Sequence, residues 1–154
     1  MYLLDIDSPD NIPNEFDLDS PKFGCLLIWD ASRSNTQEVV SVIQPLIDAG
    51  CVYFCCWGPS CEWVHDIIDE SDPYCETIDA VIMTTWHNLE PLEETIWFFL
   101  NSMWPDPAFE DSFNSSIAVI IGSKEWATTV RAALQEPEKF TQAWLRREEA
   151  ADSL

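Results

Sequence analysis

The hydrophobic residues of this chain fall into short continuous runs that are separated by polar turns and by helical patterns. Four runs of strand length lie at residues 23–30, 51–58, 80–87 and 116–123. Each run is apolar at successive positions, which is typical of strands that are buried on both faces of a sheet. Between the runs, apolar residues recur at spacings of three and four, which indicates amphipathic helices.

The helix after the first run has the clearest ends. Asn35 is a candidate N-cap because Glu38 follows three residues later, and Gly50 is a natural stop. Pro45 lies inside this helix and is expected to kink it. The other helices are expected at 60–70 with Ser60 as the cap, at 90–104 with Pro91 in the first turn, and at 124–134 and 137–151.

Strand and helix thus alternate four times, which predicts an α/β fold with a mostly parallel sheet. We expect a three-layer α-β-α sandwich of four to five strands in the flavodoxin-like or Rossmann-like order 2-1-3-4, counting the four runs along the chain. Residues 1–22 are acidic and carry three prolines. They are interpreted as an N-terminal arm in which residues 2–6 form a short edge strand, and residues 23–154 as a single α/β domain.

The charge of the chain limits its partners. Its 154 residues include 28 Asp and Glu but 7 Lys and Arg, for a net charge of −21, and no Lys or Arg lies between Arg33 and Lys124. Such a field repels phosphate backbones, so nucleic acid is not an expected partner. It attracts a basic protein, although acidity that serves solubility alone is an equal alternative.

The expected location is the cytoplasm. No apolar run is long enough to cross a membrane, and the first ten residues lack the basic and small-residue features of a signal peptide. The six cysteines lie mostly within apolar runs. Reduced thiols are therefore expected rather than disulfides.

In three of the four runs the apolar part ends in a tryptophan that is followed by one turn residue, at Trp29, Trp57 and Trp86. The carboxyl ends of parallel strands share one edge of a sheet, where open α/β folds bind ligands. The three indoles could therefore wall a pocket, but the favoured alternative is that they plug the end of the sheet. Polar groups expected to converge there are Asp30, Ser32, His87 and Ser123.

The loop that follows the first run argues against a nucleotide cofactor. Residues 30–38 contain no glycine, so they form neither a dinucleotide-binding loop nor a P-loop. Arg33 is the only cation in the sheet-edge loops before Lys124, so an anionic ligand would have to rely on it and on helix N-termini. Asp30 resembles the aspartate of aspartyl phosphotransferases, but Ser32 stands where their second aspartate is expected. No cofactor is expected.

Four of the six cysteines fall within residues 51–65. They could belong to a metal site with Cys56, Cys61, His65 and Cys75, but the usual two-residue spacing between paired cysteines is absent. Cys61 at a helix start could be a nucleophile with His87 or His65 as its base, although the neighbouring carboxylates oppose a thiolate. We favour buried core residues, with Cys51 and Cys55 facing one side of the strand and Cys56 the other, and we expect no metal.

The same segments resemble an uncharacterised family of small bacterial α/β proteins, a domain of unknown function. The resemblance covers residues 23–104 and is most distinctive at Gly58, Cys61, Val64, His65 and Asp66. It implies a bacterial, cytosolic, single-domain protein and transfers no catalytic role. It marks His65 and Asp66 as candidate binding residues.

Two functions compete on these observations. The favoured one is a non-enzymatic, acidic protein-binding module, of the immunity or antitoxin type, that binds a basic protein. The alternative is a small hydrolase, transferase or ligand-binding domain at the tryptophan-lined edge, with Asp30 or His87 as acid/base and Cys61 as nucleophile. The alternative requires Asp30 and His87 to be exposed in one cleft. In a third arrangement, the aromatic residues of 103–113 dock the protein to a larger complex.

Overall fold

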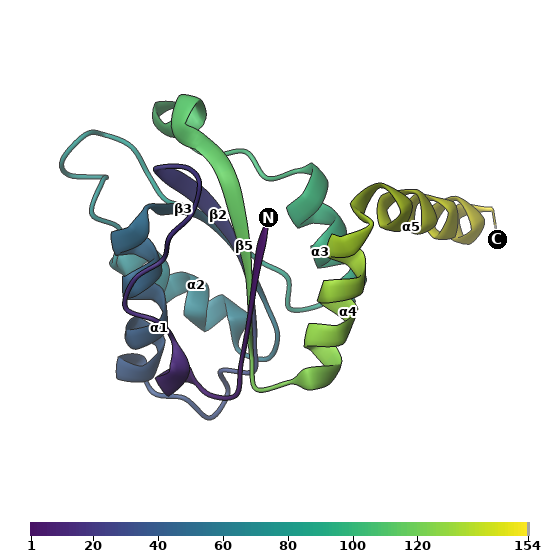
Figure 1. Cartoon of the computed structure of the whole chain (residues 1–154), viewed down its shortest axis with the longest axis horizontal. Helices are drawn as coiled ribbons and strands as arrows, with labels where there is room; N and C mark the ends of the chain where they lie inside the picture. The colour runs from purple at the N-terminus through teal and green to yellow at the C-terminus, as the bar shows by residue number, and fades with distance from the viewer. Residues whose placement is uncertain (154) are drawn as a thin grey trace.

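The computed structural model describes residues 1–153, and it consists of one parallel sheet with helices on both faces (Figure 1). The strands are β1 (Tyr2–Ile6), β2 (Lys22–Trp29), β3 (Cys51–Trp57), β4 (Met83–Trp86) and β5 (Phe113–Ile121). The α-helices are α1 (Thr36–Ala49), α2 (Cys61–Glu70), α3 (Leu92–Asn101), α4 (Lys124–Gln135) and α5 (Pro137–Asp152). Two 3₁₀ turns are η1 (Pro9–Asn11) and η2 (Pro107–Ser112).

The sheet has five strands in the order β1-β5-β2-β3-β4, and every pair is parallel. The three-layer sandwich is confirmed, but the predicted order 2-1-3-4 is wrong, because the four runs lie as 4-1-2-3 with β1 beyond the fourth. The crossovers through α1 and α2 both advance in the same direction, so these helices cover one face. The chain then returns through α3 and inserts β5 between β1 and β2. Because crossovers between parallel strands are right-handed, a connection in this reverse direction places α3 on the opposite face of the sheet.

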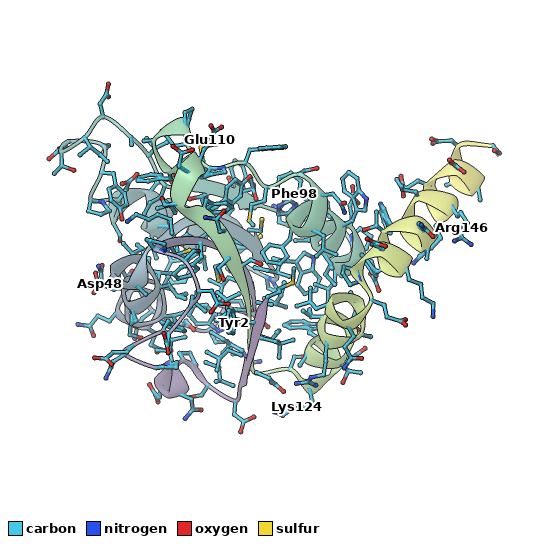
Figure 2. All side chains as sticks on the ribbon, turned by 45° about the horizontal axis from the view of Figure 1, so that its top comes forward. Tyr2, Asp48, Phe98, Glu110, Lys124 and Arg146 are labelled. Carbon is cyan, nitrogen blue, oxygen red and sulfur yellow. The ribbon has the colours of Figure 1, made fainter. Side chains whose placement is uncertain are left out.

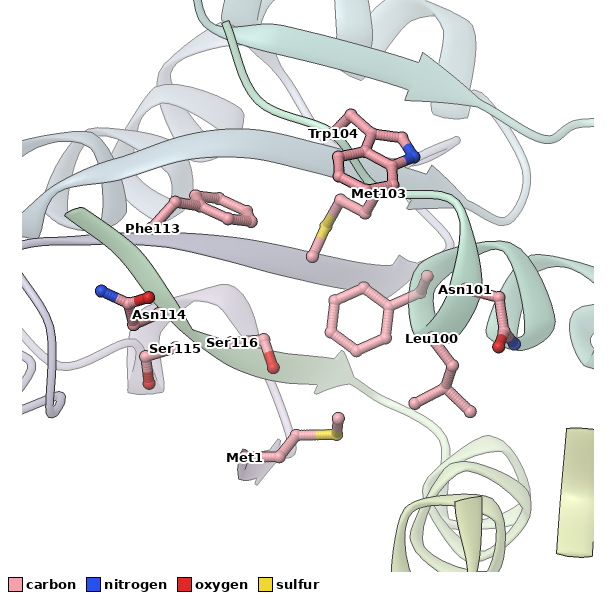
Figure 3. A pocket seen from close by; sticks show the side chains of 10 residues that line it. Met1, Leu100, Asn101, Met103, Trp104, Phe113, Asn114, Ser115 and Ser116 are labelled. Carbon is pink, nitrogen blue, oxygen red and sulfur yellow. The ribbon is translucent and has the colours of Figure 1, made fainter. Parts of the chain in front are cut away.

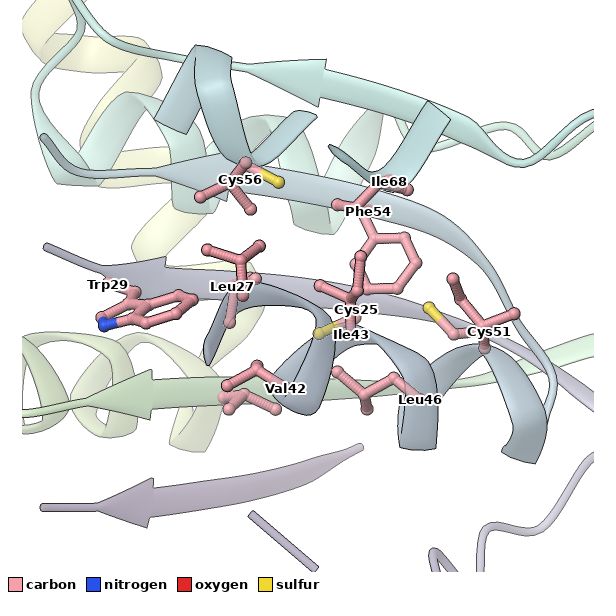
Figure 4. Close-up of a cluster of buried hydrophobic side chains, with 14 of the residues drawn as sticks. Cys25, Leu27, Trp29, Val42, Ile43, Leu46, Cys51, Phe54, Cys56 and Ile68 are labelled. Atoms are coloured by element: carbon pink, nitrogen blue, oxygen red, sulfur yellow. The ribbon is translucent and has the colours of Figure 1, made fainter. Parts of the chain in front are cut away.

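Two hydrophobic clusters lie on the two faces of the sheet. The first lies beneath α1 and α2 and contains Leu27, Ile43 and Phe54, which are almost fully buried (Figure 4). The second lies beneath α3 and α4 and contains Leu26, Ile96 and Ile120. Because successive residues of a strand point to opposite faces, the continuous apolar runs supply both clusters at once.

A register shift at the start of β3 changes which face its cysteines occupy. Cys51 pairs with Phe23, but Tyr53 pairs with the next residue, Gly24. Cys51 therefore joins Cys56 in the cluster under α1 and α2, whereas Cys55 joins the cluster under α3. The prediction that Cys51 and Cys55 share a face is wrong, because one extra residue reverses the alternation of side chains.

The predicted ends of α1 are confirmed. The Asn35 side chain accepts the Glu38 N–H at 2.9 Å, and Gly50 has φ +115° and ends the helix. The α-helix continues through Pro45. A Cβ at Gly50 would lie 2.0 Å from the carbonyl oxygen of Pro21, so this position excludes other residues for a steric reason as well.

The prediction that the Ser60 side chain caps α2 is wrong. Ser60 does occupy the N-cap of α2, but it has φ +66° and its side chain makes no capping hydrogen bond. The turn from β3 is too tight for an extended N-cap, since Gly58 before it also has φ +120° and the N–H of Cys61 bonds to the Gly58 carbonyl. Pro91 precedes α3 as its N-cap residue rather than lying within its first turn.

The last helix, α5, projects away from the sheet layers (Figure 1). Trp144 is its buried residue, and the Arg147 guanidinium lies 5.6 Å from the centre of the Trp144 ring. None of the helices within residues 1–153 combines the length and the apolar character that a membrane span needs.

Candidate functional site: the sheet edge and the β4 flank

The three strand-end tryptophans do not line a common pocket. Trp29 is buried in the cluster under α1 and α2. Trp57 packs on the opposite face, where its ring meets Trp126 edge-on at 5.0 Å and its Nε1–H donates to the Glu90 carbonyl at 2.9 Å. Trp86, on β4, is 42% exposed. The indoles separate because strand-end residues in different registers point to different faces of the sheet.

A hollow of about 510 Å³ does lie at the carboxyl ends of β2 and β5. The loops that leave these two strands run to opposite faces of the sheet, to α1 and to α4, so the hollow lies at the topological switch point. Its polar lining comes from Asp7, Asp30, Arg33, Ser34, Glu38 and Ser123, with Trp29 and Trp126 as aromatic walls. Of the residues expected at this edge, the hollow brings together Trp29, Asp30, Arg33 and Ser123. Its lining does not include Ser32, Trp57, Trp86 or His87.

Asp30 is held in its ionised form by its own loop. The Ser32 hydroxyl donates to its carboxylate at 2.6 Å and the Ser32 N–H donates at 3.0 Å. These two bonds, with a smaller contribution from Arg33, lower the pKa of Asp30 below its ordinary value. A carboxylate whose pKa is lowered is a weak general base at neutral pH.

His87 is buried, with 6% of its surface exposed, and its ring is fully engaged. Its Nδ1 lies 2.7 Å from a Glu90 carboxylate oxygen, and its Nε2 lies 2.9 Å from the Thr85 hydroxyl. Its backbone N–H donates to the Cys56 carbonyl. Asp30 is exposed, and the hollow that it lines does not include His87. The geometric requirement of the enzymatic alternative, both groups exposed in one cleft, is therefore not met.

The cysteines of residues 51–61 are buried and reduced. Burial raises the pKa of Cys55 to about 12, and it raises those of Cys51 and Cys56 well above the usual value. The pKa of Cys61 is also raised, by burial first and by Glu62 as a smaller cause. None of these thiols is therefore prepared to act as a thiolate nucleophile at neutral pH.

The four residues considered for a metal do not converge. Cys56 lies in the core and Cys75 is exposed on the loop after α2. Within residues 1–153, no group of three or more His, Cys, Asp or Glu side chains is arranged to hold a metal ion.

His65 and Asp66, the distinctive pair of the family resemblance, lie beside Trp86 instead. The His65 ring centre is 4.4 Å from that of Trp86. Its Nδ1 lies 3.0 Å from an Asp66 carboxylate oxygen, and its Nε2 lies 3.3 Å from one of Asp69. Helix α2 and strand β4 thus combine an exposed indole with two exposed carboxylates.

The segment around β4 carries an unusual concentration of exposed hydrophobic side chains. Among the residues that the structure describes, eight large hydrophobic residues are exposed, and five of them lie within residues 78–89. We call these five the β4 flank: Ile78, Val81, Met83, Trp86 and Leu89. Leu89 is 94% exposed. β4 is also the last strand of the sheet, paired only with β3.

Among the described residues, the ion pairs of lysine and arginine are all made from α4 and α5, and none lies around β4. At the β1 edge, Asp5 meets Lys124 at 3.1 Å and Arg131 at 3.7 Å. Figure 2 shows Arg146, on the projecting helix α5, on the side of the molecule opposite Asp48. Around β4, exposed carboxylates lie on α2 and on the following loop, at Asp66, Asp69, Glu76 and Asp79. Within residues 1–153, no Lys or Arg forms an ion pair with these four.

One cation does reach the loop before β4. Lys22 Nζ lies 3.0 Å from the Tyr74 hydroxyl and 5.6 Å from the centre of the Phe109 ring. Both contacts are at the amino ends of the strands, since Lys22 begins β2. The carboxylates of Asp66 and Asp69 beside Trp86 therefore have no lysine or arginine partner within residues 1–153.

The aromatic segment 103–113 forms a second surface feature. Phe109 is buried, and Trp104 is 73% exposed. Together with Met1, Met103 and Phe113, Trp104 lines a hollow of about 500 Å³ at the amino end of β5 (Figure 3). Of the aromatic residues predicted to dock to a larger complex, Trp104 is the one that is exposed, because Phe109 is buried and Phe113 packs against the cluster under α3 and α4.

The geometry defines a three-layer α/β protein with an acidic, partly apolar edge. The chain belongs to the family described as a domain of unknown function (DUF7684), whose model matches residues 1–137. The match ends where α5 begins. No curated protein and no solved structure matches the chain.

Sequence reasoning identified His65, Asp66 and Trp86 but missed the remainder of the β4 flank. The signal that could have found it is composition: the third run carries Thr84 and Thr85, whereas the other runs are almost wholly apolar. A run interrupted by two hydroxyl residues is typical of an edge strand. Leu89 follows the strand in a polar turn, where an apolar side chain has no core to enter.

Proposed function

We propose that the protein is an acidic, non-enzymatic binding module that captures a basic protein through the β4 flank. The observation that carries this proposal is the coincidence of exposed apolar residues and uncompensated carboxylates on one edge. Trp86 lies against His65, and the carboxylates of Asp66 and Asp69 contact the two nitrogens of this histidine. Contiguous exposed apolar residues mark interaction surfaces, and an acidic rim selects a basic partner and accelerates its association.

Trp86 is the expected centre of the contact. Tryptophan is enriched among residues that dominate binding energy, and a cation can lie over its exposed face. Replacement of Trp86 by alanine should weaken the complex by at least tenfold, because such residues typically contribute about 2 kcal/mol or more. The indole is 42% exposed, so its removal leaves most of the core untouched.

The proposal is tested by capture of the tagged chain's partner from its own host at low and at high salt. A flank variant carries Asp66→Asn, Asp69→Asn, Glu76→Gln and Asp79→Asn. A matched control carries Asp10→Asn, Glu15→Gln, Asp17→Asn and Asp48→Asn, all exposed residues of η1, the arm that follows it and α1. Both variants lose four negative charges, so only the location of the lost charges differs.

We expect the wild type and the control to retain a basic protein at low salt. We expect the flank variant to lose this protein. Retention should also fall at high salt, since screening weakens exposed charge pairs. Equal capture by the flank variant and the control would contradict the proposal, as would binding that does not change with salt.

A further inference from the structure

We infer that the basic partner binds as an extended segment that adds a strand to the sheet at β4. This inference rests on the proposed function and specifies the mode of binding at the same surface. An exposed strand edge presents unpaired N–H and C=O groups, and extended peptides can add to such an edge.

The hydrogen bonds around β4 show which groups point to the free edge. The His87 N–H donates to Cys56 of β3 at 3.0 Å. In a parallel ladder, alternate residues direct their N–H and C=O groups to opposite sides, so Thr84 and Trp86 direct theirs away from β3. Ile82 follows the same alternation, and its outward N–H donates to the Asp72 carboxylate at 2.8 Å.

Asp72 therefore occupies the first position of the edge, and the next two positions remain open. Among residues 1–153, no loop or side chain outside the ladder bonds to the backbone of Thr84 or Trp86, whereas Val81 is held by Asp106 at 3.2 Å. An incoming strand can thus pair with Thr84 and Trp86 without displacing an existing bond.

The two faces beside this edge differ in chemistry. Trp86 pairs with Cys56 and contacts α2, so it lies on the face that carries Asp66 and Asp69. Met83 pairs with Tyr53, whose side chain belongs to the opposite cluster, so Met83 lies on the other face. A strand beside β4 would alternate between these faces, which matches a segment in which basic and apolar residues alternate.

Arginine fits the α2 face best. Its guanidinium can stack on the exposed Trp86 ring while it donates to a carboxylate, which the ammonium of lysine does less well. The carboxylates of Asp66 and Asp69 bracket His65 beside that ring. The partner segment is therefore predicted to place arginine over Trp86 and an apolar side chain over Met83.

The probe is an eight-residue peptide that alternates Arg and Val. It is compared with the same peptide methylated at alternate backbone nitrogens, which cannot donate to a strand edge, and with a Glu–Val peptide. Hydrogen exchange of the Thr84 and Trp86 amides is followed by NMR. We expect the Arg–Val peptide to slow both exchange rates at least tenfold, and the methylated peptide to bind at least tenfold more weakly.

The protein is varied in parallel. Thr84→Pro removes the outward N–H without touching the ladder to β3, and proline is tolerated at such an edge position. Thr84→Val keeps that N–H and serves as the matched control, because the Thr84 hydroxyl is buried without a partner. Thr84→Pro should lower the affinity for the Arg–Val peptide at least tenfold, whereas Thr84→Val should leave this affinity within twofold of the wild type.

The outcomes separate the two proposals. Equal binding of the methylated and unmethylated Arg–Val peptides, or no binding of either, overturns strand addition. Capture by the flank variant and by its control tests, independently of these peptides, whether the partner is a basic protein that binds at the β4 flank. Tight binding of the Glu–Val peptide contradicts both proposals, because an acidic flank repels it.

Discussion

The Asp72 carboxylate accepts the backbone N–H of Ile82 at 2.8 Å, ten residues along the chain, and its other oxygen accepts the N–H of Tyr74 at 2.8 Å. One side chain thus closes the loop between α2 and β4 and covers the first open position of the sheet edge. An edge strand presents its outward N–H and C=O groups unpaired. Because Asp72 occupies the N–H of Ile82, the outward backbone groups of β4 that stay unpaired within residues 1–153 are those of Thr84 and Trp86.

Loss of this carboxylate should destabilise the protein. We expect Asp72→Ala to lower the free energy of unfolding by about 2–3 kcal/mol, because two backbone N–H groups lose a charged acceptor. Asp72→Asn keeps one acceptor oxygen and should cost about half as much. Urea unfolding of the two variants measures this difference. Equal stability of Asp72→Ala and the wild type would show that the bonds contribute nothing.

The cysteines should differ sharply in reactivity. Cys75 is exposed, whereas the other five are buried. Since burial raises the pKa of Cys55 to about 12 and raises that of Cys61, few thiolates are present at neutral pH. Titration with a thiol reagent should modify one cysteine quickly in the native protein and six in denaturant. Rapid native modification of Cys61 would contradict the assignment of this thiol to the core.

Cysteine in the core should be replaceable by a small apolar residue better than by serine. Cys56→Ala should cost about 1 kcal/mol. Cys56→Ser buries a hydroxyl among apolar neighbours and should cost about 2–3 kcal/mol. Cys75→Ser is the exposed control and should leave stability unchanged. Thermal unfolding of the three variants compares them, and a serine variant as stable as the alanine variant would argue against a dry environment at Cys56.

Asp30 gives a pH dependence of defined sign. Its folded-state pKa is lowered, first by the Ser32 hydroxyl, so its contribution to stability is present above the unfolded pKa near 3.8 and is lost as pH falls through the folded pKa. Ser32→Ala should therefore raise the pKa of Asp30 and destabilise the protein at neutral pH but not in acid. NMR titration measures the pKa of the Asp30 carboxyl in the wild type and in Ser32→Ala. Unfolding of both proteins at neutral and at acid pH compares their stabilities. A pKa unchanged in Ser32→Ala would refute the role of the hydroxyl.

The sequence predicted the layers but not their arrangement. Continuous apolar runs such as residues 23–30 determine that a strand is buried on both faces, and the Asn35 and Gly50 caps are local, so these features can be read directly. Strand order depends on where a connection returns, and residues 102–112 carry no pattern that shows β5 lying between β1 and β2.

The candidate site was only partly predictable for a related reason. The adjacency of β2 and β5 brings Asp30 and Arg33 near Ser123, as the strand ends suggest. Trp29, Trp57 and Trp86 look equivalent in sequence, but a tryptophan at the end of a strand faces one layer or the other according to register. The exposure of Trp86 follows from β4 being the edge strand, which Thr84 and Thr85 indicate but the tryptophan itself does not.

The most direct test of the account locates the partner's basic residues on the surface. A carbodiimide joins a carboxylate to an amine in direct contact with it, and within residues 1–153 no lysine pairs with the four carboxylates around the β4 flank. Mass spectrometry of the crosslinked complex should place partner lysines on Asp66, Asp69, Glu76 or Asp79. Crosslinks confined to carboxylates of α1 and the N-terminal arm, with none on these four residues, would contradict the proposal that the β4 flank binds the partner.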